Sequence, residues 1–164
     1  MEIKRFYVGF GYDVHRLSED RLLIIGGVTV PHDRGLLGHS DADVLTHAII
    51  DAIIGALGKG DIGQHFPDTD DAYKNISSLS LLENTVEKLT DAGFKLHNLD
   101  STIVAQRPKL APYIPAIRKE LSTVLRADES HINIKAKTTE GLGFCGNEEG
   151  IAAYAIVSIV SFQP

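Results

Sequence analysis

Apolar and β-branched residues gather in separate runs along the chain, each bounded by glycine, proline or polar residues. Runs of this kind are typical of β-strands, and one of them, at residues 131–139, also alternates as a half-buried strand does. We therefore predict strands at residues 5–14, 21–31, 95–106, 131–139 and 151–162.

Other stretches have the periodicity of helices. We predict helices at residues 41–57, at residues 77–91 and, after several prolines, within residues 107–127. Ser40 or Asp41 is suited to cap the start of the first helix, because both side chains accept hydrogen bonds from free backbone N–H groups. Gly58 and Gly60 are suited to end it.

The first predicted helix has two unlike faces. With about 3.6 residues per turn, the buried stripe comprises Leu45, Ile49, Ala52 and Ala56, and the opposite face carries Asp43, His47 and Asp51. His47 is therefore expected on a polar face rather than in the core. Asp43 or Asp51, each one turn away, is placed to orient its imidazole.

Two long loops interrupt this pattern, a Gly-, Pro- and Asp-rich loop at 60–75 and a glycine-rich segment at 140–150. Loops of this length in compact domains often carry function. The order of the elements predicts an α/β fold, more narrowly an α+β sandwich in which helices pack on one face of a mixed β-sheet. Because no repeat or linker divides the chain, we predict a single domain over residues 1–164.

Composition narrows the class of protein. The chain has 164 residues, 43% of them hydrophobic, and a net charge of −6, which provides no positive field for a nucleic acid. An acidic chain can still bind phosphate through local lysines, backbone N–H groups or a metal. The only cysteine, Cys145, excludes an intrachain disulfide. With no signal peptide or membrane-length apolar run, we expect a cytoplasmic protein with neither nucleic-acid nor membrane partners.

The pair Asp13 and His15 indicates a metal site. Two residues apart on a strand, both side chains point to the same face. Alone the pair is a weak signal, because two polar groups often share a strand face. His47 adds a third ligand type, and three protein ligands with an open fourth position are usual in catalytic zinc sites. The same donors suit non-haem Fe(II), so residue types do not identify the metal.

Further polar residues are placed where phosphate groups bind in proteins. His39 and Ser40 precede a predicted helix N-terminus, which attracts anions, although Ser40 is equally suited to simple capping. Lys109 follows a strand on a proline-rich loop. Thr138 and Glu140 follow another strand and offer a hydroxyl and a carboxylate, the latter a ligand type for Mg²⁺.

The remaining motifs are less specific. Aspartates in the 60–75 loop suit either the hydroxyls of a polyol or ordinary turns. The chain contains no P-loop and no G-x-G-x-x-G sequence between a strand and a helix, so neither nucleotide-binding fold is predicted. Cys145 is interpreted as a small packing residue.

Taken together, the motifs resemble those of one family, the 2-C-methyl-D-erythritol 2,4-cyclodiphosphate synthases. The motifs, in order, are DVHRL, IIGGVTVP, GLLGHSDADVLTHAIIDA, GDIGQHFPDTD, STIVAQRPKLAPYI and KAKTTEGLGF, within residues 8–160. The resemblance implies homotrimers with active sites between subunits. It also implies a phosphorus–oxygen lyase of the non-mevalonate isoprenoid pathway, which converts 4-diphosphocytidyl-2-C-methyl-D-erythritol 2-phosphate into the 2,4-cyclodiphosphate and CMP.

The resemblance further implies roles for individual residues. Asp13, His15 and His47 match ligands of Zn²⁺, and Glu140 matches a ligand of the Mg²⁺ or Mn²⁺ that bridges the substrate diphosphate. His39 and Thr138 match positions that stabilise the transition state. The implied substrate contacts are Asp13, Val14, His15, His39, Ser40, Asp61, Ile62, Gly63, Phe66, Pro67, Asp68, Thr69, Asp70, Ala105, Gln106, Arg107, Pro108, Lys109, Leu110, Ala111, Lys137, Thr138, Thr139, Glu140, Phe144 and Asn147.

Two positions depart from the family pattern. Asn147 stands where many members have Arg, and Tyr12 stands where many have Phe. The resemblance implies that both lie near a cavity on the trimer axis, where family members bind isoprenoid diphosphates. Because neutral Asn cannot replace a bidentate phosphate partner, we expect weak or absent farnesyl-diphosphate binding with catalysis retained.

Two other functions remain open at this point. A metal-dependent phosphoesterase would use the same three ligands to activate water, and its product would be hydrolysed rather than cyclic. A non-catalytic trimeric binding protein would hold the ligand without releasing CMP.

Overall fold

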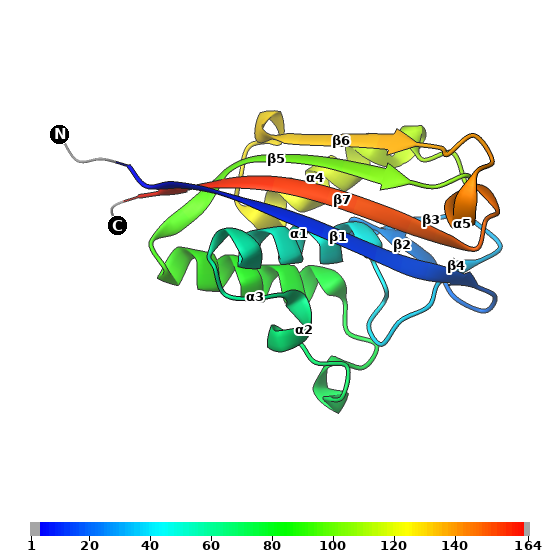
Figure 1. Ribbon diagram of the computed structural model, residues 1–164, viewed down its shortest axis with the longest axis horizontal. Coiled ribbons are helices and arrows are strands. Elements are labelled where there is room, and N and C mark those ends of the chain that lie inside the picture. Colours follow the sequence, from blue (N-terminus) through cyan, green and yellow to red (C-terminus); the bar gives the residue numbers. More distant parts are fainter. Residues whose placement is uncertain (1–3, 163–164) are drawn as a thin grey trace.

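The computed structural model describes residues 4–162 and shows a main sheet with helices against one of its faces (Figure 1). The five-stranded sheet has the order β4-β1-β7-β5-β6. Its strands are β1 (Phe6–Ser18), β4 (Gly35–Leu36), β5 (Phe94–Val104), β6 (Ile132–Lys137) and β7 (Gly150–Ser161). Only β5 and β6 pair in parallel, so the sheet is mixed, as predicted. The predicted domain range, 1–164, extends past the described residues at both ends.

Three long helices pack on the sheet. They are α1 (Val44–Ala56), α3 (Ser78–Asp91) and α4 (Ile114–Leu125). The predicted 60–75 loop contains a short helix, α2 (Ile62–His65), and a 3₁₀ turn, η1 (Asp71–Tyr73). The other short elements are η2 (Ala111–Tyr113), η3 (Glu129–His131) and α5 (Gly143–Gly146). No helix of residues 4–162 is long and apolar enough to cross a membrane.

The predicted strand at 21–31 is wrong in detail, because it is a hairpin rather than one strand. It consists of β2 (Leu23–Ile25) and β3 (Val28–Val30), which pair with each other apart from the main sheet. Gly26 and Gly27 form the turn with φ of +56° and +77°, a conformation that L-residues with a side chain rarely adopt.

Helix α1 begins later than predicted, and more of its residues are buried than its periodicity indicates. Its N-cap is Asp43, whose side chain accepts a hydrogen bond from Thr46 N, rather than Ser40 or Asp41. Ten of its 13 residues are buried. The expected polar face does not exist as such, because α3 and the β2–β3 hairpin cover the side of α1 that faces away from the sheet. His47 and Asp51 are only half-buried, and Asp43 is fully buried.

Glycines in β1 allow α1 to lie directly on the strand. A Cβ atom placed on Gly9 would lie 1.9 Å from the carbonyl oxygen of Ala52, and one placed on Gly11 would lie 1.9 Å from that of Ala48. Any side chain at these positions would therefore collide with helix backbone. The close approach fixes where the start of α1 meets the residues that follow Gly11 on β1.

The opposite face of the sheet, which we call the open face, is apolar, and no element within residues 4–162 covers it. Its residues are Phe6, Val8, Phe10, Tyr12 and Val14 of β1 with Tyr154 and Ile156 of β7. Phe10 lies opposite Ile156 and Tyr12 lies opposite Tyr154 in the antiparallel register. Phe10 is 59% exposed. An exposed apolar surface made of several neighbouring side chains is typical of a protein–protein contact.

The contact of β1 with α1 predicts unlike effects of alanine at two glycines. Gly11→Ala is expected to lower the free energy of unfolding by about 3 kcal/mol, because the new methyl group overlaps helix backbone. Gly55→Ala, in the last turn of α1, meets only the Phe10 carbonyl oxygen at 3.8 Å. It is expected to stabilise the fold by roughly 0.5–1 kcal/mol through helix propensity. Urea unfolding of both variants checks this, and equal effects would contradict it.

Candidate metal and phosphate site

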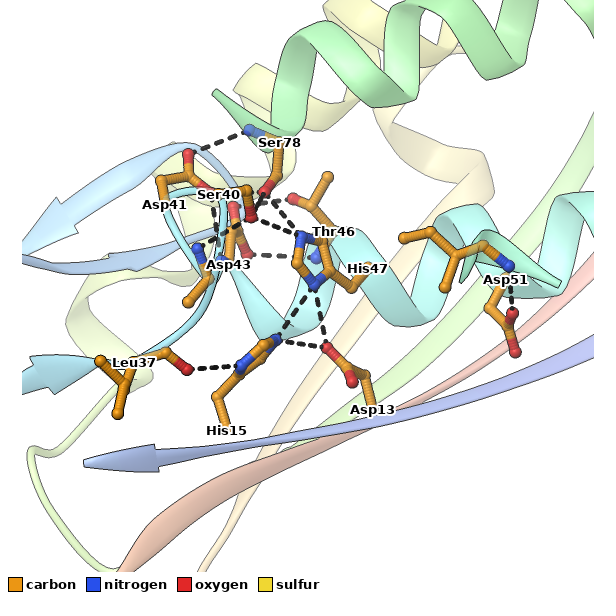
Figure 2. Close-up of polar contacts among 12 residues, drawn as sticks. Asp13, His15, Leu37, Ser40, Asp41, Asp43, Thr46, His47, Asp51 and Ser78 are labelled. Carbon is orange, nitrogen blue, oxygen red and sulfur yellow. Dashed lines mark hydrogen bonds and ion pairs between the residues drawn. The ribbon is translucent and has the colours of Figure 1, made fainter. Parts of the chain in front are cut away.

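Strand β1 and helix α1 bring three potential metal ligands together. Asp13 and His15 leave β1 on the face that meets α1, and His47 lies one turn into that helix (Figure 2). Asp13 Oδ2 lies 2.9 Å from His15 Nε2 and 3.1 Å from His47 Nδ1. The two imidazole nitrogens are 3.1 Å apart. The predicted convergence of these side chains is therefore confirmed in the geometry.

The three ligand atoms fit a metal ion. These atoms all lie within 4.8 Å of one another, and each belongs to a half-buried residue. A tetrahedral zinc ion with bonds of about 2.0–2.1 Å would separate its ligands by about 3.3 Å, close to the spacing observed. One carboxylate and two imidazoles are also the donor types of catalytic zinc sites.

Hydrogen bonding prepares His15 for this role. Its Nδ1 lies 2.8 Å from the carbonyl oxygen of Leu37, which can only accept, so Nδ1 donates and the neutral ring keeps a lone pair on Nε2. Burial lowers the pKa of His15, but the hydrogen bond and charge of Asp13 outweigh burial and raise it. Burial raises the pKa of Asp13, but the imidazoles of His15 and His47, when protonated, outweigh burial and lower it to about 2.

The predicted orientation of His47 by Asp43 or Asp51 is wrong. His47 Nε2 instead lies 2.9 Å from Ser78 Oγ and 3.1 Å from Ser40 Oγ. Asp51 accepts a hydrogen bond from Ile62 N and so fixes the start of α2. Helical spacing identified residues one turn away from His47. It could not show that backbone N–H groups of other segments would hydrogen-bond to both carboxylates.

Asp43 fastens the β2–β3 hairpin to the start of α1. Its carboxylate accepts hydrogen bonds from Gly26 N at 2.8 Å and from Gly27 N at 2.7 Å. It also accepts from the backbone N and the hydroxyl of Thr46. Burial raises the pKa of Asp43, opposed by the hydrogen bonds from Gly26 and Thr46. The residue holds two elements together, and its carboxylate hydrogen-bonds the hairpin and Thr46 rather than the side chains of the three candidate metal ligands.

An open pocket of about 360 Å³ lies beside the three ligands. Predicted site residues that line it are Asp13, His15, His39, Ser40, His47, Ile62, Gly63, Phe66 and Asp68. Tyr73 and Leu81 also line it, and sequence reasoning missed them because both have the pattern of ordinary packing residues. His39 Nε2 lies 3.1 Å from the carbonyl oxygen of Asp70, which connects the start of the helix region to the η1 segment.

A second pocket of about 400 Å³ lies at the ends of β5 and β6. Predicted residues that line it are Ala105, Gln106, Pro108, Lys109, Leu110, Ala111, Lys137 and Thr138. Its lining shares no residue with that of the first pocket. Within one chain, the predicted site is therefore divided in two.

Several predicted residues line neither pocket. They are Val14, Asp61, Pro67, Thr69, Asp70, Arg107, Thr139, Glu140, Phe144 and Asn147. Val14 lies on the open face, and Asp61 caps α2 by accepting from Gln64 N. Glu140 is exposed and accepts a hydrogen bond from the Thr138 hydroxyl at 2.9 Å, beside the second pocket. Asn147 ends α5 and donates to Glu149 at 3.3 Å.

Comparison with known proteins agrees with this arrangement. The family model of the YgbB family matches residues 6–160. This chain belongs to the YgbB family. A protein of Clostridioides difficile named 2-C-methyl-D-erythritol 2,4-cyclodiphosphate synthase is 61% identical over 149 residues, 91% of this chain and 92% of that protein. A protein of the same name from Geobacter sulfurreducens is 62% identical over 150 residues, 92% of this chain and 96% of that protein.

Solved structures of the family share the fold. An IspF from Plasmodium falciparum in complex with CDP has a TM-score of 0.85 and 33% identity, over 99% of this chain and 100% of that chain. The bifunctional IspDF of Campylobacter jejuni has a TM-score of 0.94 and 43% identity. It covers 98% of this chain, which spans only 44% of that longer protein.

The different surroundings of Asp43 and Asp51 predict different costs of removal. Asp43→Ala is expected to lower the free energy of unfolding by roughly 3–5 kcal/mol, because it leaves several buried donors without an acceptor. Asp51→Ala removes one hydrogen bond at a half-buried site and is expected to cost about 1 kcal/mol. Urea unfolding compares the two, and an equal cost would contradict the assigned role of Asp43.

Proposed function

We propose that this chain is a 2-C-methyl-D-erythritol 2,4-cyclodiphosphate synthase of the non-mevalonate isoprenoid pathway. It converts 4-diphosphocytidyl-2-C-methyl-D-erythritol 2-phosphate into the cyclodiphosphate and CMP. The observation that carries the proposal is the convergence of Asp13, His15 and His47 beside a pocket, in a chain of this family. Its single cysteine and net charge of −6 fit a reducing cytoplasm and a small-molecule substrate rather than a nucleic acid.

The proposed reaction needs no nucleophile from the protein. An oxygen of the substrate's 2-phosphate attacks the β-phosphorus, and the bond from that phosphorus to the bridging oxygen breaks as CMP leaves. The difficulty is to hold two anionic groups within reach of each other. His39 and Ser40 in the first pocket and Lys109 and Thr138 beside the second offer N–H and O–H donors that offset this repulsion.

Two metal ions belong to the proposal. Asp13, His15 and His47 would hold Zn²⁺, and exposed Glu140 would hold the Mg²⁺ or Mn²⁺ that bridges the diphosphate. Such ions supply Lewis-acid polarisation of phosphate oxygens. The Leu37 carbonyl that fixes the His15 ring keeps a lone pair of that ring directed into the site.

We further propose that three copies assemble through the open face, with each active site formed between neighbours. The open face is apolar and is not covered by any of the residues that the structure describes, which supports burial by other copies. The division of the site into two separate pockets supports the same arrangement. The first pocket of one subunit would then meet the second pocket of its neighbour to form one complete site. The Plasmodium relative is a CDP complex, which supports a cytidine diphosphate as a ligand of this protein.

The axial cavity of such a trimer would be lined near Tyr12, whose ring lies 5.0 Å from that of Tyr154 on the open face. Asn147 offers a neutral amide, already bonded to Glu149, where a phosphate-binding Arg is common in the family. We therefore propose that farnesyl diphosphate binds weakly or not at all in this protein.

Removal of one metal ligand is expected to abolish both metal binding and turnover. His47→Ala should purify with less than a tenth of the wild-type zinc and should release CMP at least 100-fold more slowly. Elemental analysis and a CMP-release assay measure the two effects. The exposed His131, the last residue of η3, provides a control, because His131→Ala should retain both properties.

The products distinguish this function from its alternatives. Wild-type protein should yield cyclic diphosphate, and a chelator should stop the reaction until zinc is restored. Predominantly hydrolysed diphosphate would instead indicate a phosphoesterase, and bound substrate without CMP release would indicate a binding protein.

Charging the open face should separate the subunits and remove activity. The pair Phe10→Glu with Ile156→Lys places opposite charges across the β1–β7 register, which spares the sheet while making the face polar. Wild type should sediment at three times the 17.8 kDa chain mass and the double variant at that mass. The variant should still bind zinc but release no CMP. Lys119→Glu on exposed α4 surface is the control, and an active monomer would contradict shared active sites.

A further inference from the structure

A serine and an aspartate lie behind His47, on the side away from the other metal ligands. Ser78 is the first residue of α3 and is fully buried, and its Oγ lies 2.9 Å from His47 Nε2 (Figure 2). The same Oγ hydrogen-bonds Asp41 Oδ1. A continuous path of hydrogen bonds therefore runs from Asp41 through Ser78 to His47.

The direction of each bond in this path follows from what each group can donate. The Asp41 carboxylate can only accept, and it does so from Asp43 N, from Ser78 N and from the Ser78 hydroxyl. A serine has a single hydroxyl proton, and Ser78 gives it to Asp41. Its oxygen is then left to accept, and His47 Nε2, 2.9 Å away, is placed to donate to it.

This direction fixes which nitrogen of His47 is free to bind a metal. With its proton on Nε2, the neutral ring has its lone pair on Nδ1, the atom that faces Asp13 Oδ2 and His15 Nε2. The reverse tautomer would instead donate from Nδ1 to Asp13 Oδ2, and its proton would then occupy the metal-binding position. His15 is fixed in the complementary way by the Leu37 carbonyl, through its other nitrogen.

We propose that Asp41 and Ser78 are positioning residues that hold His47 in the metal-binding tautomer. This rests on the proposal that Asp13, His15 and His47 hold a metal. Ser40 is a weaker candidate for the same role, because its Oγ already accepts from Ala42 N and no carboxylate takes its proton. A carboxylate that acts through a neighbouring group on a metal-bound histidine is a known way to raise the affinity of the site for its metal.

Asp41 also has a structural role that has to be separated from this one. It accepts from the backbone N of Ser78 and so caps α3 from outside, where Ser77 makes no side-chain cap bond. Ser78→Ala keeps that backbone bond and removes only the hydroxyl. Asp41→Asn also keeps an acceptor for the cap, but its NH₂ group can donate to Ser78 and reverse the path.

Zinc affinity of the purified protein tests the proposal without use of the reaction. Competition with a chromophoric chelator should show zinc bound 10–100-fold more weakly by Ser78→Ala than by wild type. Ser77→Ala, one residue earlier and exposed, is the matched control and should bind as wild type does. Asp41→Asn should weaken binding by a similar factor, and the double variant should be no weaker than Ser78→Ala, because both changes break one path.

The tautomer itself is read from ¹⁵N resonances of His47 in the metal-free protein. Wild type and Ser77→Ala should show protonated Nε2, whereas Ser78→Ala should show a mixture and Asp41→Asn a shift toward protonated Nδ1. Unchanged zinc affinity and an unchanged tautomer in Ser78→Ala would overturn the proposal. If wild type binds no metal, the metal proposal fails, and the tautomer still decides the role of Ser78. If Ser78→Ala does not fold, Asp41→Asn gives the same two readouts.

Discussion

The direct contact of helix α1 with strand β1 is the constraint on which the site depends. Gly9 and Gly11 have no side chain, so the carbonyl groups of α1 lie where Cβ atoms would otherwise be. With the helix held this close, His47 reaches within 3.1 Å of the next inward-facing residue of the strand, Asp13. A larger separation would leave the imidazole and the carboxylate on two surfaces with water between them.

Two aspartates in the segment before α1 fix that end of the helix through different hydrogen bonds. Asp43 accepts from the hairpin and from Thr46, and is completely buried. Asp41 accepts from the first residue of α3 and, through Ser78, orients the proposed metal ligand His47. A buried carboxylate requires several donors to offset its lost hydration, and those of Asp43 come from two parts of the chain, the hairpin turn and Thr46 of α1. The same hydrogen bonds therefore hold these elements together and orient His47 in the site.

Sequence patterns predicted the strands, the mixed sheet and the approach of Asp13 and His15 to one face. The strands and the shared face of Asp13 and His15 are local features, since strand alternation and two-residue spacing are properties of short segments. The mixed sheet was instead predicted from the order of the elements. Ser78 could not be found in this way, because it lies 31 residues from His47 and belongs to another helix. The hairpin at Gly26 and the burial of Asp43 were missed for a related reason. Periodicity gives the faces of a helix, but not which later segment covers each face.

The separation of the two pockets has a genetic consequence under the proposed assembly. If each chain gives its metal half to one neighbour and its Lys109 half to the other, defects in the two halves are not equivalent. A chain damaged only at His47 still has a sound second pocket, and a chain damaged only at Lys109 still has a sound first one. Mixed rings of two such inactive chains would contain one intact site each, so two loss-of-function alleles would complement each other.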